Sequence, residues 1–281
     1  MRLADLRDRS VAVWGSGPEG RAAVTAVARQ SPSRLIAVDD SARYAEVSWT
    51  GDVAACAPLA GGDHAFPALV TADVVVCSPE VPAAHPWLEE LHRRGVALTS
   101  GSALWLADHA ARTIAVTGSD DTAGLISHLL TALGRPNTLG TLPLLDQPAA
   151  AGDYVIALDG HQAGLTVSPR VAVLAREAPL DLLAHHPEMI VVNGVDLALR
   201  DAIRGRTDAN GFPPIPAGAD DSRFRVEDGA FYCSDEVLFP RAALGSLDEL
   251  SLCLALAVLD GLGVDVPGCK RALREAVAAR H

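Results

Sequence analysis

A chain of 281 residues is long enough to form two domains of ordinary size, each with its own hydrophobic core. Its formal net charge of −12 argues against nucleic acid as a partner, because nucleic-acid binding relies on clustered lysine and arginine. No apolar run approaches the roughly 20 residues that span a bilayer, and the N-terminus shows no signal-peptide pattern. We therefore expect a cytoplasmic protein with no membrane partner.

Cysteine and lysine usage narrows the chemistry further. Five cysteines are dispersed without the spacing of a metal site, which predicts reduced and mostly buried thiols. Lys270 is the only lysine, beside twenty-two arginines. Any mechanism that needs a lysine at a position other than 270 is therefore excluded.

Strand and helix patterns alternate through the first part of the chain. Short apolar runs predict strands at residues 11–15, 35–40, 72–79 and 96–100. Alanine- and leucine-rich stretches between them, such as residues 21–30 and 85–95, predict helices. This alternation predicts a doubly wound parallel sheet over residues 1–110.

A second alternation runs from residue 111 to residue 281 and predicts a second α/β domain. Its strands are expected at residues 113–118, 153–160, 169–175, 189–194, 224–229 and 230–239. Residues 210–222 are rich in proline, glycine and aspartate and predict a surface loop. A long helix is expected over residues 247–262, and a final amphipathic helix over residues 267–281.

The first glycine-rich turn reads GSGPEG at residues 15–20 and fits the pattern G-x-G-x-x-G between a strand and a helix. Glycines at Gly15, Gly17 and Gly20 allow close backbone approach to a phosphate, and Asp39 ends the next strand, where an acid can hold a ribose hydroxyl. The pattern predicts a nucleotide or dinucleotide site. A tight turn without a ligand fits it too, and Glu19 would place negative charge near a bound phosphate.

Several collinear segments resemble the Mur ligases: VAVWGSGPEGRAA, AVDDSA, ADVVVCSPEVPAAHPWLEELHRRGVALTSGSALWLA and TIAVTG. The likeness extends over nearly the whole chain and is greatest to the branch that adds D-glutamate to UDP-N-acetylmuramoyl-L-alanine. It implies a Rossmann-like first domain that holds the UDP part of the substrate, followed by a P-loop-type central domain. It also implies that the family's third domain is absent, unless another polypeptide supplies it.

The resemblance places the UDP-side contacts in the first domain. SPEVP at residues 78–82 is similar to the family's SPGIP loop, with Glu80 in place of glycine. TLGTLP at residues 138–143 stands where the family carries GNIGxP, which helps to hold the pyrophosphate. A nucleotide or a UDP-sugar remains a candidate ligand. Its candidate contacts are Gly15, Ser16, Gly17, Gly20, Asp39, Asp40, Ser41, Ser78 and Pro79.

The family's ATP-binding loop is degenerate in this sequence. In the family, a TGTxGKST loop cradles phosphates with its backbone, and its lysine reaches the β- and γ-phosphates. Here the loop is about three residues shorter and lacks Gly-Lys, and the resemblance places the family's Mg²⁺-binding glutamate on Ala157. The degenerate loop consists of Gly118, Ser119, Asp120, Asp121 and Thr122. We therefore expect neither ATP nor Mg²⁺ to bind as it does in the family.

Acidic and histidine residues follow several strands of the second domain. Because carboxyl ends of parallel strands meet at one edge of a sheet, these side chains are candidates for metal binding or acid–base catalysis. Solvated loop residues without shared geometry fit the same pattern. The candidates are Asp120, Asp121, Asp159, His161, Asp181, His185 and His186.

Three functions are consistent with this sequence. The first is a Mur-ligase-like protein without ATP-dependent ligase activity, which binds a nucleotide-linked metabolite, a second copy of itself or a partner enzyme. The second is an enzyme of a specialised biosynthetic pathway that uses the Asp/His residues without ATP. The third is an NAD(P)-binding Rossmann protein built on the GSGPEG turn.

Overall fold

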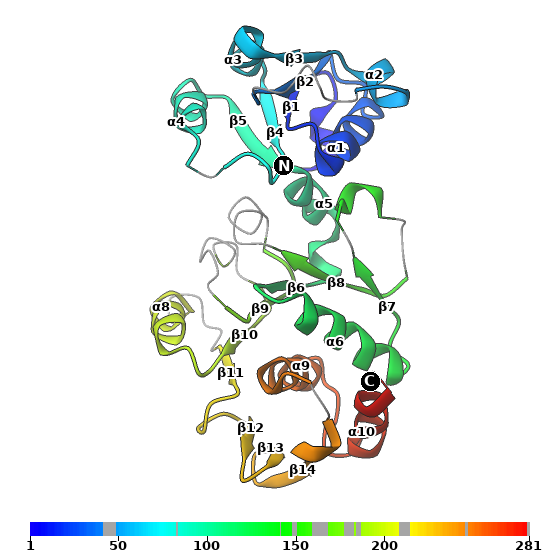
Figure 1. Ribbon diagram of the computed structural model, residues 1–281, viewed down its shortest axis with the longest axis vertical. Coiled ribbons are helices and arrows are strands. Elements are labelled where there is room, and N and C mark those ends of the chain that lie inside the picture. The colour runs from blue at the N-terminus through cyan, green and yellow to red at the C-terminus, as the bar shows by residue number, and fades with distance from the viewer. Residues whose placement is uncertain are drawn as a thin grey trace. The chain divides into compact units, whose positions relative to one another are not determined.

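The computed structural model describes residues 1–41, 49–82, 84–140, 142–147, 151–158, 168–176, 183, 187–207, 214–244 and 247–279. These residues form two compact α/β units (Figure 1). The first unit contains Met1–His109 together with residues 142–147, and the second begins at Ala110. Sequence patterns had assigned residues 142–147 to the second domain. They belong with the first because Leu145 packs against its apolar core.

The first unit is built on a five-stranded parallel sheet. Its strands are β1 (Ser10–Trp14), β2 (Arg34–Asp39), β3 (Leu59–Gly61), β4 (Val74–Cys77) and β5 (Ala97–Ser100). Their order in the sheet is β3-β2-β1-β4-β5, with every neighbouring pair parallel. The chain therefore winds outward in both directions from β1, which confirms the doubly wound prediction and is the Rossmann-type order.

Helices cover both faces of this sheet. They are α1 (Pro18–Ala28), α2 (Asp52–Cys56), α3 (Ala65–Val70), α4 (Pro86–Arg93) and α5 (Gly101–His109). Side chains of β1 alternate between the faces, so Val11 and Val13 join one buried cluster while Ala12 and Trp14 join another. A central strand that is buried on both sides consists of a continuous run of apolar residues, which is why β1 could be predicted from the sequence.

The second unit contains a six-stranded parallel sheet. Its strands are β6 (Thr113–Thr117), β7 (Asn137–Gly140), β8 (Asp153–Leu158), β9 (Val171–Leu174), β10 (Met189–Asn193) and β11 (Ile215–Ala217). Their order is β11-β10-β9-β6-β8-β7. Residues 215–217 were predicted to lie in a surface loop, which is wrong, because they extend the sheet in parallel beside β10. Proline is tolerated there because β11 is an edge strand.

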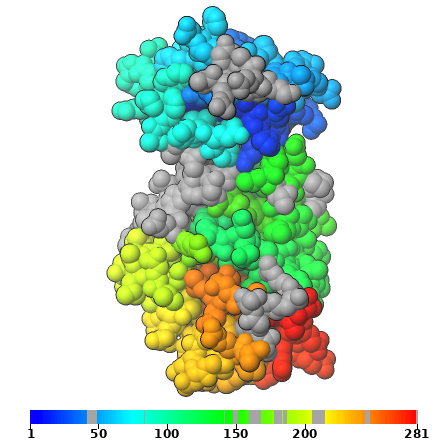
Figure 2. Space-filling model, in the orientation of Figure 1, coloured from blue at the N-terminus to red at the C-terminus, as the bar shows by residue number. Residues whose placement is uncertain are grey.

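A small antiparallel sheet completes the second unit. It consists of β12 (Phe224–Glu227), β13 (Ala230–Cys233) and β14 (Glu236–Pro240). Residues 230–239 were predicted as one strand, but the chain turns after Cys233, where Ser234 adopts a φ of 54°. Helices α6 (Asp120–Ala132), α8 (Leu197–Thr207), α9 (Glu249–Gly261) and α10 (Lys270–Ala279) pack with the two sheets. Figure 2 shows the surface of α10, in red, next to the yellow and orange surface of the small sheet.

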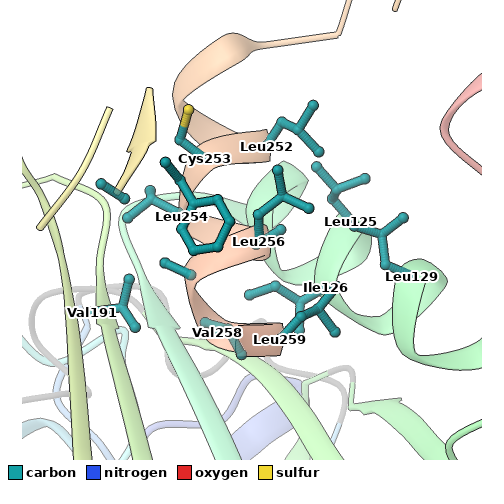
Figure 3. Close-up of a cluster of buried hydrophobic side chains, with 14 of the residues drawn as sticks. Leu125, Ile126, Leu129, Val191, Leu252, Cys253, Leu254, Leu256, Val258 and Leu259 are labelled. Carbon is teal, nitrogen blue, oxygen red and sulfur yellow. The ribbon is translucent and has the colours of Figure 1, made fainter. Parts of the chain in front are cut away.

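Helix α9 is the centre of the second unit's core. It lies between the large and the small sheet and packs against α6 (Figure 1). Every residue from Ser251 to Leu259 is buried, so the helix is apolar all round rather than on one face. Figure 3 shows Leu125, Ile126 and Leu129 of α6 turned toward the leucine and valine side chains of α9.

No helix within the described ranges combines the length and the apolar character that crossing a bilayer requires. The cysteines are free thiols: Cys77, Cys233 and Cys253 are buried, Cys269 is half-buried and Cys56 is exposed. Burial raises the pKa of Cys77 to about 12.

Candidate functional site

The glycine-rich turn lies at the carboxyl end of β1, where the strand order of the first sheet reverses between β1 and β4. Gly15 has a φ of 118°, which favours glycine, and a Cβ there would overlap with Ser78 Oγ. A Cβ at Gly20 would overlap with the backbone carbonyl oxygen of Gly15, so α1 packs directly on the end of the strand. A Cβ at Gly17 would overlap with Glu80 Oε1. Close approach therefore favours glycine at all three positions, most strictly at Gly20, where the neighbour is backbone.

Asp39 ends β2 and ties two loops together. One carboxylate oxygen accepts a hydrogen bond from Ser16 Oγ, and the other accepts one from the backbone N–H of Ser41 at 2.9 Å. The residue is buried, with 8% of its surface exposed. Desolvation by burial alone would raise the pKa of Asp39, but the hydrogen bonds from Ser16 and Ser41 outweigh it and hold this pKa below its ordinary value. Asp39 is thus ionised and already hydrogen-bonded within the protein.

Asp40 directly follows β2 and belongs to a cluster of polar and aromatic side chains. Its Oδ1 accepts from Trp14 Nε1 at 2.9 Å, and its Oδ2 lies 3.0 Å from His85 Nε2. His85 Nδ1 accepts from the backbone N–H of Trp87 at 3.2 Å, which caps helix α4 and places the ring proton on Nε2. Trp14 stacks on Trp87 with ring centroids 5.6 Å apart.

Two residues of this site were not chosen as contacts from the sequence. His85 was not among the predicted contacts, because nothing in its sequence neighbours indicates a partner at Asp40. Glu80 was recognised only as a departure from a glycine. In the structure its Oε2 accepts a hydrogen bond from the backbone N–H of Gly17 at 3.1 Å. Glu80 therefore reaches across to the start of α1.

The structure brings most of the predicted nucleotide contacts together in the first unit. Gly15, Ser16 and Gly17 follow β1, the acids follow β2, and Ser78 follows β4. Ser78 is buried, with 5% of its surface exposed, and its Oγ has no hydrogen-bond partner among the described residues. Pro79 is half-buried next to it.

The turn of the second unit that corresponds to an ATP loop is short. β6 ends at Thr117 and α6 begins at Asp120, so only Gly118 and Ser119 separate them. Gly118 has a φ of 77°, and a Cβ there would lie 2.8 Å from Arg176 Cβ. The geometry is that of a tight strand-to-helix turn.

Helix α6 is capped by its own residues. Ser119 Oγ accepts from the backbone N–H of Thr122 at 3.1 Å and from Thr122 Oγ1 at 2.9 Å. Thr122 Oγ1 also lies 2.8 Å from Ser251 Oγ of α9. Asp120 and Asp121 are exposed and open the helix, where the macrodipole favours negative charge. The only lysine of the sequence, Lys270, pairs with Glu236 Oε1 of β14 at 2.7 Å.

The remaining Asp/His candidates, namely Asp159, His161, Asp181, His185 and His186, lie outside the described residues. Among the residues that are described, no group of three or more histidine, cysteine, aspartate or glutamate side chains is placed to hold a metal ion. Asp120 and Asp121 are therefore the members of this set whose surroundings the structure gives.

The two parallel sheets, each with a glycine turn after its central strand, define an α/β protein of the nucleotide-binding type of architecture. No protein-family model matches the chain. It is 49% identical to a UDP-N-acetylmuramoyl-L-alanine--L-glutamate ligase of Micromonospora sp. and 48% identical to one of Salinispora tropica. Each match covers 99% of this chain and 67% of the relative. The chain belongs to the Mur ligase family.

Solved structures agree at the level of fold. A crystal structure of the UDP-N-acetylmuramate:L-alanyl-gamma-D-glutamyl-meso-diaminopimelate ligase from Neisseria meningitides superposes with a TM-score of 0.56 at 18% identity. The match covers 96% of this chain and 98% of that one. The two units therefore have the fold of the N-terminal and central domains of Mur ligases.

Two details of the comparison refine the sequence interpretation. The relatives are named for L-glutamate, whereas the resemblance pointed to the branch that adds D-glutamate. The motifs behind that resemblance surround nucleotide-type turns and carry no information about the configuration of an amino acid. In addition, the alignment to the Micromonospora relative is 308 positions long and this chain has 281 residues, so at least 27 positions of the relative have no counterpart here.

Proposed function

We propose that this chain is a Mur-ligase-like protein that does not carry out ATP-driven ligation and that binds a nucleotide-linked metabolite through its first unit. The observation behind the first half of the proposal is the two-residue turn between β6 and α6. A phosphate loop needs several consecutive backbone N–H groups around the phosphate and a lysine at its end. This turn offers neither.

Charge at the turn supports the same conclusion. Asp120 and Asp121 begin α6, at the point where a triphosphate would have to approach. At an effective dielectric near 20, each carboxylate within about 5 Å of a phosphate charge costs about 3 kcal/mol, where a lysine would contribute a similar amount in favour of binding. ATP is therefore opposed by the length of the turn and by its charge.

The nucleotide half of the proposal is supported by the first unit. Its glycine turn follows β1 at the strand-order reversal, and Asp39 ends β2, where a ribose-binding acid lies in nucleotide folds. The relatives are named for a UDP-linked muramoyl compound. A UDP-linked metabolite is accordingly the first ligand class to test.

An ADP-release assay tests the loss of ligation. The protein is incubated with Mg·ATP, UDP-N-acetylmuramoyl-L-alanine and either L-glutamate or D-glutamate, beside the Salinispora relative as a positive control. We expect glutamate-dependent ADP release from the relative and none from this chain. Release that requires both the muramoyl substrate and one of the glutamates would refute the proposal.

NAD(P) is the second ligand class, because the strand order β3-β2-β1-β4-β5 with an acid at the end of β2 also suits a dinucleotide. Fluorescence titration with NADH and NADPH, beside UDP and UDP-N-acetylglucosamine, distinguishes the two classes. Saturable binding of NADH or NADPH without binding of UDP would favour NAD(P) as the ligand class.

A further inference from the structure

The start of helix α1 is occupied by a carboxylate of the same chain. Glu80 Oε2 accepts the backbone N–H of Gly17 at 3.1 Å, and Gly17 is the residue that caps this 11-residue helix. The N-terminus of a helix is where backbone N–H groups and the macrodipole favour an anion. The Glu80 carboxylate lies where a Cβ at Gly17 would be. Glu80 thus stands where the phosphate of a ligand would approach the turn.

A second feature beside the same turn points to a ligand. Ser78 Oγ is buried and has no partner among the described residues, although a hydroxyl both donates and accepts. It lies against Gly15, in the turn whose next glycine contacts Glu80. A buried hydroxyl without a partner costs about 1–3 kcal/mol, and an acceptor atom of a ligand at the turn would remove that cost. Ser78 is placed to donate to an anion at the glycine turn.

The other acids near the turn do not occupy this position. Asp39 is engaged by Ser16 and Ser41, and Asp40 lies against Trp14 and His85. The Nε of Arg21, in the first turn of α1, donates to the carbonyl oxygen of Ser16 at 3.1 Å and adds positive charge beside the turn. Glu19 is a further acid in the first turn of α1, and Glu80 is the carboxylate that accepts the backbone N–H of Gly17.

We propose that Glu80 is a built-in occupant of the anion site at the glycine turn, and that a phosphate- or pyrophosphate-bearing ligand binds there by displacing it, with Ser78 as a further donor. The inference rests on the proposed nucleotide-binding function and adds a regulatory element to it. Affinity for the phosphate part of a ligand is set by competition with the chain's own carboxylate. Removing that carboxylate opens the site.

Calorimetric titration of the full chain with inorganic pyrophosphate and with UDP tests this directly. We expect Glu80→Ala to bind pyrophosphate about tenfold more tightly than the unmodified chain, with Glu80→Gln between them, because a charged competitor is lost. Glu89→Gln is the matched control, since it removes one exposed carboxylate from α4 without touching the turn, and its affinity should not change. Adding Ser78→Ala to Glu80→Ala should reverse a large part of the gain. Thermal unfolding of each variant confirms that it is folded.

The outcomes separate the two proposals. UDP that binds equally well to the unmodified chain and to Glu80→Ala would overturn the role of Glu80 and leave nucleotide binding intact. Pyrophosphate that binds more tightly to Glu80→Ala, while UDP binds to neither, would support the role of Glu80 and overturn nucleotide binding. An absence of binding by both probes in every variant would overturn both.

Discussion

At the scale of single residues, the first unit's candidate site is held together by its own hydrogen bonds. Asp39 and Asp40 each accept a donor on both carboxylate oxygens, and Glu80 accepts the amide of Gly17. Buried polar groups in stable proteins are normally paired in this way. The turn is therefore organised before any ligand arrives, and Ser78 is the group left over.

The glycines of the turn differ in what surrounds them, which predicts different costs for alanine. A Cβ at Gly20 would meet the backbone of Gly15, which cannot move without shifting β1, whereas a Cβ at Gly17 would meet the end of the flexible Glu80 side chain. We expect Gly20→Ala to lower the free energy of unfolding by about 1–3 kcal/mol and Gly17→Ala by clearly less. Urea unfolding of both variants measures the difference. Equal losses would mean that Glu80 is held as firmly as the backbone.

Asp39→Asn tests the charge that joins the glycine turn to the end of β2. The folded-state pKa of Asp39 lies below its ordinary value of 3.8, so ionised Asp39 stabilises the folded protein above that pH, and the contribution is lost as the pH falls through the folded value. We expect the variant to be less stable than the unmodified chain at neutral pH, and the gap to narrow below pH 3.8. The measurement is the unfolding free energy of the variant and of the unmodified chain, at neutral pH and below pH 3.8. A gap that stays constant would show that the charge of Asp39 contributes nothing.

At the scale of elements, the β6–α6 turn is the feature on which the proposed loss of ATP binding rests. Two residues join the strand to the helix, and the Ser119 side chain caps the helix. Thr122 is tied in turn to Ser251 of α9, so the turn is anchored to the core. A substitution that changes the charge of this turn does not lengthen it, so charge and length can be tested separately.

The double variant Asp120→Ala/Asp121→Lys separates charge from geometry. It removes both carboxylates and supplies a lysine at the start of α6, yet it adds no backbone N–H group to the two-residue turn. We expect this variant, like the unmodified chain, to show no stabilisation by Mg·ATP in thermal unfolding. A clear upward shift of its Tm would identify charge, not turn length, as the barrier.

The elements also show how far sequence patterns reach. Strands β1, β4, β6 and β9 were predictable because three or more consecutive apolar residues are buried in each. The edge strand β11 was missed because its three residues include a proline within a loop-like composition. β13 and β14 were merged because the turn at Ser234 lacks the glycine or asparagine that usually marks a left-handed position.

The candidate site was predictable to a similar extent. Glycine spacing and the acid after β2 identified the turn, since those residues follow each other closely along the chain. The contacts of Glu80 with Gly17 and of His85 with Asp40 join residues 63 and 45 positions apart, which is beyond the reach of a local pattern. Only the parallel packing of β1, β2 and β4 brings them together.

At the scale of the whole molecule, family membership suggests a ligase, whereas the short β6–α6 turn is the basis of the proposal that ATP is not used. The chain is 49% identical to the Micromonospora relative over 99% of its length, and at least 27 positions of that relative have no counterpart in this chain. The fold of both units is kept, while the turn that would hold ATP is reduced to Gly118 and Ser119. Fold is therefore no guide to activity here, and function must be judged from the sites.

Calorimetric titration of the full chain with Mg·ATP is the most direct test, because it measures ATP binding without assuming a reaction. We predict no saturable binding up to millimolar ATP, while the Salinispora relative binds under the same conditions. A Kd of about 1 mM or lower, equivalent to a binding free energy of about −4 kcal/mol, would contradict the prediction and restore this chain to the ATP-using ligases.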